Sequence, residues 1–275
     1  MKNEYPEAIE NLELQAEKLA AVGGPACPQD FSALEGSGTL RVSLFWGYDE
    51  HEGKVHDRAN AGAMLRTLTD ECRGELSTCG FSLVSRSTSA ATLARTLGDR
   101  RVEVNLFTTS LPADSAENQS LVSAYLEQNR LSRAIRERFY RELVDSDVVF
   151  YMGHSRLGGG MGFDDQTGVT TLVNAVLRLP LQPVLEALRQ RPTRLKVLGM
   201  FSCRSEEYFR RAFQDANPSL SLILTTGDIG YLSGEQTSLG ALEAILSKYC
   251  GFAFLDSMTS VTEYDPTMTY LIRGR

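Results

Sequence analysis

The sequence is poor in the features that mark membrane-spanning and nucleic-acid-binding proteins. No run of about 18 apolar residues occurs, which is the length that a transmembrane helix needs. Positive charge is in deficit, because 28 lysines and arginines stand against 35 aspartates and glutamates, which gives a net charge of −7. Binding to nucleic acid or to an anionic membrane needs a concentrated cationic surface. We therefore expect a soluble globular protein that neither binds nucleic acid nor inserts into a membrane.

The sequence also lacks the cysteine spacings that are typical of zinc sites and of disulfide-rich proteins. The five cysteines are irregularly spaced and form no CxxC pair, so they indicate neither a zinc knuckle nor a disulfide framework. Cys72 and Cys79 would be able to pair in an oxidising compartment, but we expect two buried free thiols. The N-terminal segment is acidic and lacks the apolar core of a secretory signal. We expect a cytoplasmic protein by default, or a secreted or periplasmic one if the sequence is a mature form.

The 275 residues are enough to bury a full core, and they divide into two parts. Apolar residues at helical spacing predict a helix over 6–22, and a stretch rich in glycine and proline follows it. We interpret 1–38 as an N-terminal helix with its linker and 39–275 as one domain. The sequence does not indicate the oligomeric state.

From residue 39 onward, strand patterns alternate with helix patterns. The predicted strands are 40–48, 80–87, 102–109, 147–153, 195–202, 220–226 and 267–274. The predicted helices are 59–79, 118–146, 180–191, 205–216 and 234–249. Nearly continuous apolar strands that alternate with helices are typical of a mostly parallel sheet covered by helices on both faces. We therefore predict an α/β fold.

One predicted strand continues into a polar, glycine-rich segment, VVFYMGHSRLGGG, at 148–160. Two hypotheses follow: Ser155 is a nucleophile on a sharp turn, or His154 is a base that serves a nucleophile from elsewhere in the chain. The serine hypothesis needs the pattern G-x-S-x-G and a histidine later in the sequence. Leu157 stands where the second glycine belongs, and no histidine follows His154. Both observations favour the histidine hypothesis.

A cysteine supplies the nucleophile that this hypothesis needs. Cys203 follows the predicted strand 195–202, and a predicted helix begins almost directly after it. Open α/β sheets bind their ligands at the carboxyl ends of the strands, where neighbouring strands lie about 4.8 Å apart. We therefore expect His154 and Cys203 to lie close together. The helix dipole and the imidazole would both favour the thiolate, and the backbone N–H groups of Ser155 and Cys203 would form an oxyanion hole.

The stretches VVFYMGHS and KVLGMFSC, in this order and about 50 residues apart, resemble the motifs of the caspase-like cysteine peptidases. This superfamily includes caspases, metacaspases, legumains and gingipains. The resemblance implies a caspase-like three-layer α/β sandwich with His154 as the catalytic histidine and Cys203 as the nucleophile. Ser155 replaces the glycine that usually follows the histidine, and the caspase pentapeptide QACxG is absent around Cys203. The chain looks like a single-chain, bacterial-type member.

Four further residues are candidates for binding substrate. Gly158 lies in a glycine run that lacks the lysine and hydroxyl of a P-loop, and we interpret the run as a flexible wall beside the histidine or as a flexible segment without function. Asp164 follows this run. Thr226 and Asp228 follow the strand after the cysteine, where caspase-like enzymes usually build their primary specificity pocket. The two aspartates would select a basic P1 side chain by charge pairing, and a turn or helix cap is the alternative for Asp228.

A metal site is another alternative. The segment 48–57 contains His51, His56 and several carboxylates, which are suitable metal ligands. The spacing of the two histidines puts them out of register on a helix, and no third group of ligands is evident. A charged loop at the rim of an active site is the simpler interpretation.

The sequence therefore predicts a thiol protease, a cysteine-type endopeptidase that hydrolyses a polypeptide substrate through an acyl-enzyme, without a metal or organic cofactor. Two alternatives stay open. One is an inactive caspase-like binding or scaffold module, which Ser155 motivates. The other is a metal-dependent hydrolase that uses His51 and His56.

Overall fold

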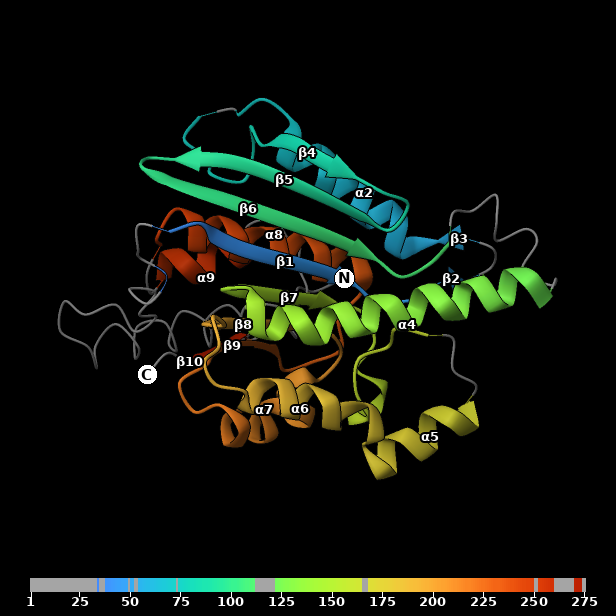
Figure 1. Cartoon of the computed structure of the whole chain (residues 1–275). Coiled ribbons are helices and arrows are strands. Elements are labelled where there is room, and N and C mark those ends of the chain that lie inside the picture. The colour runs from blue at the N-terminus through green and yellow to red at the C-terminus, as the bar shows by residue number, and fades with distance from the viewer. Residues whose placement is uncertain are drawn as a thin grey trace, which may run out of the picture.

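The centre of the molecule is an eight-stranded sheet with the strand order β10-β9-β8-β7-β1-β6-β5-β4 (Figure 1). The computed structural model describes residues 34, 38–48, 50–51, 54–72, 74–111, 122–164, 168–249, 252–259 and 270–273. The sheet strands are β1 Leu40–Trp46, β4 Ser82–Arg86, β5 Ala90–Leu97, β6 Arg100–Thr108, β7 Val148–Met152, β8 Val197–Phe201, β9 Ser221–Thr225 and β10 Tyr270–Arg273. The helix predicted over 6–22 lies outside the described residues.

The direction of the strands divides the sheet into a parallel centre and antiparallel edges. Strands β6, β1, β7, β8 and β9 pair in parallel, while β4, β5 and β10 pair antiparallel with their neighbours. The five parallel strands therefore end on one side of the sheet, beyond Thr108, Trp46, Met152, Phe201 and Thr225. We call this side the carboxyl edge. The prediction of an α/β fold with a mostly parallel sheet is confirmed.

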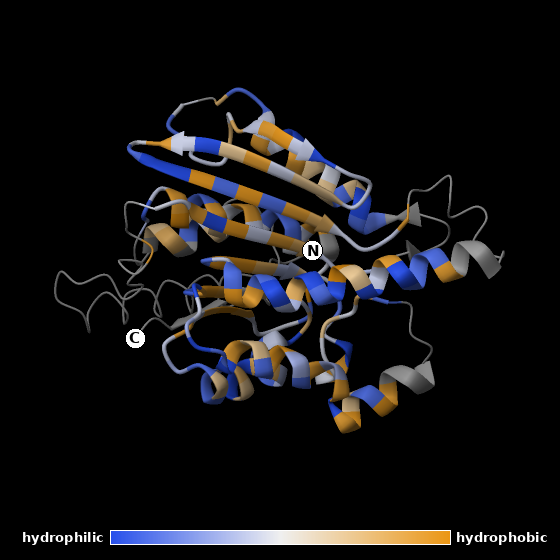
Figure 2. Cartoon of the chain, in the orientation of Figure 1, coloured by the Kyte–Doolittle hydropathy of each residue, from blue (hydrophilic) through white to orange (hydrophobic). Residues whose placement is uncertain are grey.

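Helices cover both faces of the sheet and complete three layers (Figure 1). One face carries α2 His56–Thr69, α8 Tyr231–Leu246 and α9 Phe252–Thr259, and the other carries α4 Val122–Asp145, α6 Gln182–Arg189 and α7 Ser205–Ala216. In Figure 2 the central strands are largely orange, whereas α4 alternates between orange and blue. This is the pattern of strands buried on both faces and of helices with one buried side.

Strand β7 shows how the two cores share one strand. Val148 and Phe150 belong to the core under α2 and α8, whereas Val149 and Tyr151 belong to the core under α4 and α6. All five residues of β7 are buried. Successive side chains of a strand point to opposite faces, so an uninterrupted apolar run is what a double-sided core requires.

The sequence prediction is wrong for the segment after α2. The helix ends at Thr69 rather than at residue 79. Cys72 and Cys79 form a disulfide, so the expectation of two free thiols is wrong as well. The reason lies in contacts far away in the sequence: the Glu243 carboxylate on α8 accepts hydrogen bonds from the N–H groups of Ser77 and Thr78, at 2.8 to 3.0 Å. These contacts hold 77–78 as a docked loop.

Several short elements are absent from the sequence prediction. The predicted strand 80–87 exists as β4, but it forms an edge hairpin with the unpredicted β5, and all five residues of β4 are exposed. A two-stranded hairpin joins β2 Glu50–His51 to β3 Lys54–Val55. Helices α5 Gly168–Leu177 and α9 were also missed. In the described ranges, no helix has both the length and the apolar character to cross a membrane.

Replacing Glu243 by alanine is expected to lower the free energy of unfolding. Glu243 is 6 % exposed and also accepts hydrogen bonds from the Thr78 and Ser247 hydroxyls. Its removal leaves buried donors without an acceptor, which costs about 1–3 kcal/mol for one such group. Urea unfolding measures the loss. Glu186→Ala, an exposed site on α6, is the control, and equal stability of the two variants would contradict the docking role of Glu243.

Candidate active site at the carboxyl edge

The register of β7 and β8 sets the positions of His154 and Cys203. Met152 lies opposite Phe201 in the parallel pair, and His154 and Cys203 each follow two residues later. The N–H of Gly153 donates to the Phe201 carbonyl at 3.4 Å, so the two chains stay together beyond the strands. The structure therefore brings both residues to equivalent positions just beyond the ends of neighbouring strands.

Ser155 links the two segments directly. Its hydroxyl donates a hydrogen bond to the backbone carbonyl of Cys203. The residue is 3 % exposed, so this hydroxyl is turned into the protein and toward the Cys203 backbone. We call the segment after β7 that contains His154 the histidine segment, and the segment after β8 that contains Cys203 the cysteine segment. The serine that stands where caspase-like peptidases usually have glycine thus joins these two segments.

Tyr151, a residue of β7, holds the histidine segment in place through its hydroxyl. Its buried hydroxyl donates to the His154 carbonyl at 3.0 Å and accepts from the N–H of Gly162 at 2.8 Å. A Cβ on Gly47 or on Gly153 would approach the Tyr151 hydroxyl to 2.5 Å, so both positions require glycine. Burial raises the pKa of Tyr151 well above its ordinary value, which keeps the hydroxyl protonated and able to donate. The His154 side chain is exposed at the surface above this support.

Cys203 lies in the tight connection between β8 and α7. It is half-buried, and its Sγ lies 3.6 Å from the Ile229 carbonyl in the segment after β9. Arg204 adopts a left-handed conformation with φ of 50°, and its N–H donates to the Gly227 carbonyl at 2.8 Å. Ser205 then begins α7 and donates from its hydroxyl to the Met200 carbonyl at 2.7 Å. The thiol therefore lies between the end of β8 and the segment that follows β9.

The glycine run after His154 is packed rather than open. Gly158, at φ of +83°, is buried, and a Cβ there would meet the Tyr208 ring at 3.0 Å. A Cβ on Gly159 would meet the backbone of Asn174 on α5 at 2.8 Å. Both glycines are needed for close approach, and Gly158 also for its left-handed turn. This differs from the flexible segment that the sequence suggested.

The two aspartates expected to select substrate are already paired with arginines. Asp164 is half-buried, and its carboxylate lies 3.2 Å from Arg136 and 4.0 Å from Arg156. Asp228 is exposed and lies 3.2 Å from Nε of Arg204, the residue after Cys203. The structure thus brings Asp228 and the half-buried Thr226 close to the cysteine segment. Asp164 instead pairs with Arg156, a residue that precedes the glycine run.

The alternative metal site is only partly within the described residues. His56 is half-buried at the start of α2, and His51 lies in the β2–β3 hairpin. No group of three potential metal-ligating side chains occurs among the residues that the structure describes. Asp49 and Glu52, which belong to the same predicted cluster, lie outside those residues.

Asp57, one of the carboxylates that the sequence grouped in the charged segment 48–57, is instead a buried acid at the carboxyl edge. Its side chain is 0 % exposed, and Oδ2 accepts from the N–H groups of Thr109 and Ser110 at 3.0 and 2.9 Å. Its other oxygen has no partner among the described residues. Burial raises the pKa of Asp57 to about 6, although the backbone donors lower it. The residue joins the start of α2 to the segment after β6.

No protein-family model matches the sequence, and no curated protein matches it. The function is therefore inferred from the geometry of the carboxyl edge, together with the resemblance of two motifs to those of caspase-like peptidases.

Tyr151→Phe is expected to loosen the histidine segment. The change removes one hydroxyl and leaves a buried N–H and a carbonyl without their partner, which destabilises the protein by about 1–3 kcal/mol. Amide hydrogen exchange at Gly162 should become faster. Tyr140→Phe, on the half-buried face of α4, is the matched control and should change neither quantity. Unchanged exchange at Gly162 in Tyr151→Phe would contradict the positioning role.

Asp57 is expected to make folding stability depend on pH. Its pKa is about 6 when folded and 3.8 in the unfolded chain, so the folded state favours the protonated carboxyl. The contribution of the Asp57 carboxyl to the free energy of unfolding is largest below pH 4. It decreases by about 3 kcal/mol as the pH rises to about 6 and beyond. Unfolding of Asp57→Asn at pH 4.5 and 7.5 should lack this fall, while the exposed-site control Asp145→Asn keeps it. An equal fall in all three proteins would show that Asp57 does not cause it.

Proposed function

We propose that the protein is a caspase-like cysteine endopeptidase in which Cys203 and His154 form the catalytic dyad. The observation that carries the proposal is the register of β7 and β8, which sets the two residues at equivalent positions beyond adjacent parallel strands. The hydrogen bond from Ser155 to the Cys203 carbonyl supports it, because it ties the two segments together. An imidazole and a thiol held this way are the elements of a nucleophile with its proton carrier.

In the proposed reaction, the Cys203 thiolate attacks the scissile carbonyl carbon. A carbon–sulfur bond forms, and the carbon–nitrogen bond to the leaving amine breaks as His154 donates a proton to that amine. Water then attacks the thioester carbon while His154 accepts its proton, so that a carbon–oxygen bond forms. The carbon–sulfur bond breaks, the Cys203 thiolate is restored, and the carboxylic acid is released. The N–H groups of Ser155 and Cys203 would bind the oxyanion, a donor type whose loss lowers kcat by about 100-fold to 1,000-fold.

The substrate is proposed to be a polypeptide that contacts Thr226 and Asp228 in the segment after β9. Asp228 is the better candidate for attracting a basic P1 side chain, because it is exposed and lies beside the cysteine segment through Arg204. Asp164 is less suited, because its side chain is 28 % exposed and lies near two arginines, whereas that of Asp228 is 70 % exposed and lies near one. Gly158 would contribute by shaping the turn beneath the substrate.

A thiol-reactive peptide probe tests the dyad. We expect labelling of the wild type, none of Cys203→Ala, and at least a tenfold slower rate in His154→Ala, because the imidazole no longer supports the thiolate. Cys27→Ala and Cys250→Ala are controls that should label normally. Cleavage of a peptide library by the same variants should follow the labelling and should persist after chelation.

Each alternative has its own outcome in this experiment. Labelling without any cleavage would indicate a binding or scaffold module with an accessible thiol. Cleavage that survives in Cys203→Ala but is lost after chelation would indicate a metal-dependent hydrolase instead.

A further inference from the structure

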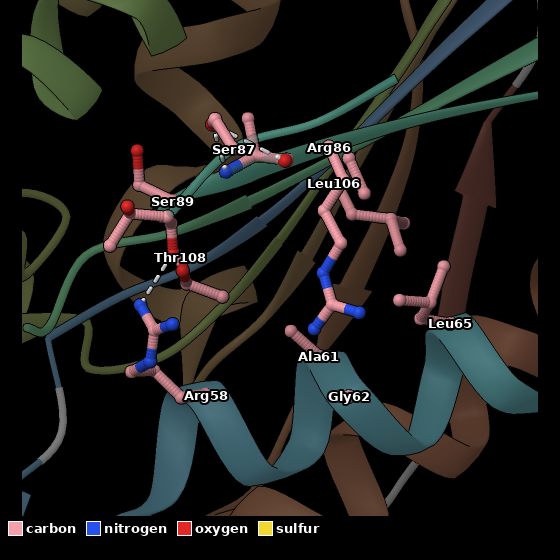
Figure 3. A pocket seen from close by; sticks show the side chains of 12 residues that line it. Arg58, Ala61, Gly62, Leu65, Arg86, Ser87, Ser89, Leu106 and Thr108 are labelled. Carbon is pink, nitrogen blue, oxygen red and sulfur yellow. Dashed lines mark hydrogen bonds between the residues drawn. The ribbon is translucent and has the colours of Figure 1, made fainter. Parts of the chain in front are cut away.

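A small cleft opens between α2 and the hairpin of β4 and β5, away from the candidate dyad (Figure 3). Its volume is about 60 Å³. A water molecule needs about 10–15 Å³ by this measure, so the cleft has room for a group of several heavy atoms, such as a carboxylate. Its polar lining consists of Arg58, Arg86, Ser87, Thr88, Ser89 and Thr108.

The cleft is positively charged, whereas the chain as a whole is negatively charged. Among the residues that the structure describes, two arginines and no aspartate or glutamate line the cleft, although the whole chain has a net charge of −7. The remaining polar groups are hydroxyls, which donate hydrogen bonds to an anion as readily as to water. Ala61, Gly62 and Leu65 of α2 form the apolar floor. This combination favours an anionic group on a partly apolar stem.

The two guanidinium groups reach the cleft from opposite walls. In Figure 3 the Arg58 side chain extends from α2 toward Ser89 and Thr108, and Arg86 extends from β4 toward Ala61. Arg58 is fixed, because its Nη1 donates to the carbonyls of Thr88 and Ser110 at 2.7 and 3.1 Å. Arg86 is exposed, and within the described residues its side chain makes no hydrogen bond or ion pair. One arginine is thus preorganised, and the other can close on a bound anion.

The cleft lies on the same edge of the sheet as the candidate dyad. Thr108 pairs with Trp46 on β1, and Trp46 pairs with Met152 on β7, two residues before His154. Strands lie about 4.8 Å apart, so the two or three strand spacings between β7 and the β5–β6 border amount to roughly 10–15 Å. An extended peptide spans about 3.3–3.6 Å per residue. A polypeptide held at the dyad would reach the cleft three to five residues from its scissile bond.

We propose that this cleft binds the side-chain carboxylate of an aspartate or glutamate in the polypeptide substrate, three to five residues from the bond that is cut. The carboxylate lies between the two guanidinium groups, which match its geometry with paired N–H donors. The hydroxyls of Thr88 and Ser89 in the β4–β5 turn complete the shell, whereas the Ser87 hydroxyl is already bonded to the backbone of Ala90. That the bound polypeptide is a substrate rests on the proposed peptidase function, whereas the carboxylate site itself does not.

The site is tested first by binding, independently of catalysis. The protein carries Cys203→Ala, and the probes are two fluorescein-labelled peptides that differ only in one glutamate or glutamine. We expect the glutamate peptide to bind roughly three- to tenfold more tightly, the range for a partly exposed, charge-assisted contact. Arg86→Gln should abolish the difference, and Arg86→Glu should reverse it. Arg133→Gln, an exposed arginine on α4, should leave it intact. Equal binding of both peptides, or a difference that Arg86→Gln does not change, would overturn the carboxylate site.

The role in substrate selection is tested by cleavage of a peptide library with an active Cys203. Enrichment of aspartate or glutamate at one position three to five residues from the cut, lost in Arg86→Gln and kept in Arg133→Gln, is the expected result. Cleavage without that enrichment would overturn the selection role while leaving the peptidase function standing. If no peptide is cut but binding still discriminates through Arg86, the peptidase function fails and the selection role with it, whereas the carboxylate site remains.

Discussion

The parallel pairing of β7 with β8 is the constraint on which the candidate site depends. Each strand is buried on both faces, and the alternation of side chains along it assigns every residue to one of two cores. A shift of register by one residue would move each side chain to the wrong face. The packing of the two cores therefore fixes Met152 opposite Phe201, and through that pair it fixes where His154 and Cys203 leave the sheet. The positions of the two candidate residues therefore follow from the packing of the two cores.

Beyond the strand ends, hydrogen bonds between side chains and backbone groups fix the position of the chain. Tyr151 holds the His154 carbonyl and the Gly162 N–H, and Ser155 holds the Cys203 carbonyl. On the far side of the cysteine, the Ser205 hydroxyl accepts from the Thr225 N–H at 2.8 Å, which connects the start of α7 to the end of β9. Loops are accurate enough for chemistry only when such contacts hold them. Here every contact comes from a residue in a buried strand or within four residues after its end.

Local sequence patterns predicted those parts of the fold in which burial alone decides the residue type. The strands β7, β8 and β9 are nearly continuous apolar runs, and the cysteine and histidine after them were located from sequence alone. The disulfide loop was not, because the residue that organises it, Glu243, lies about 165 positions away and has no local signature. Tyr151 was also missed: a tyrosine in an apolar strand looks like core, and only the folded chain shows that its hydroxyl reaches the histidine segment. The cleft between Arg58 and Arg86 depends on a hairpin whose second strand the sequence pattern did not reveal.

The carboxyl edge is also where the described part of the chain tolerates unfavourable polar burial. Among all the described residues, seven buried side-chain polar atoms lack a hydrogen-bond partner, and five of them belong to residues at or beside this edge: Trp46, Asp57, Ser110, Arg156 and Ser202. Each such group costs about 1–3 kcal/mol relative to a satisfied one, and packing at the edge also requires glycine where Tyr151 approaches Gly47 and Gly153. A region optimised only for stability would not concentrate these costs in one place. These costs lie at the ends of the parallel strands, the edge at which α/β proteins bind their ligands, and the two apolar cores offset them.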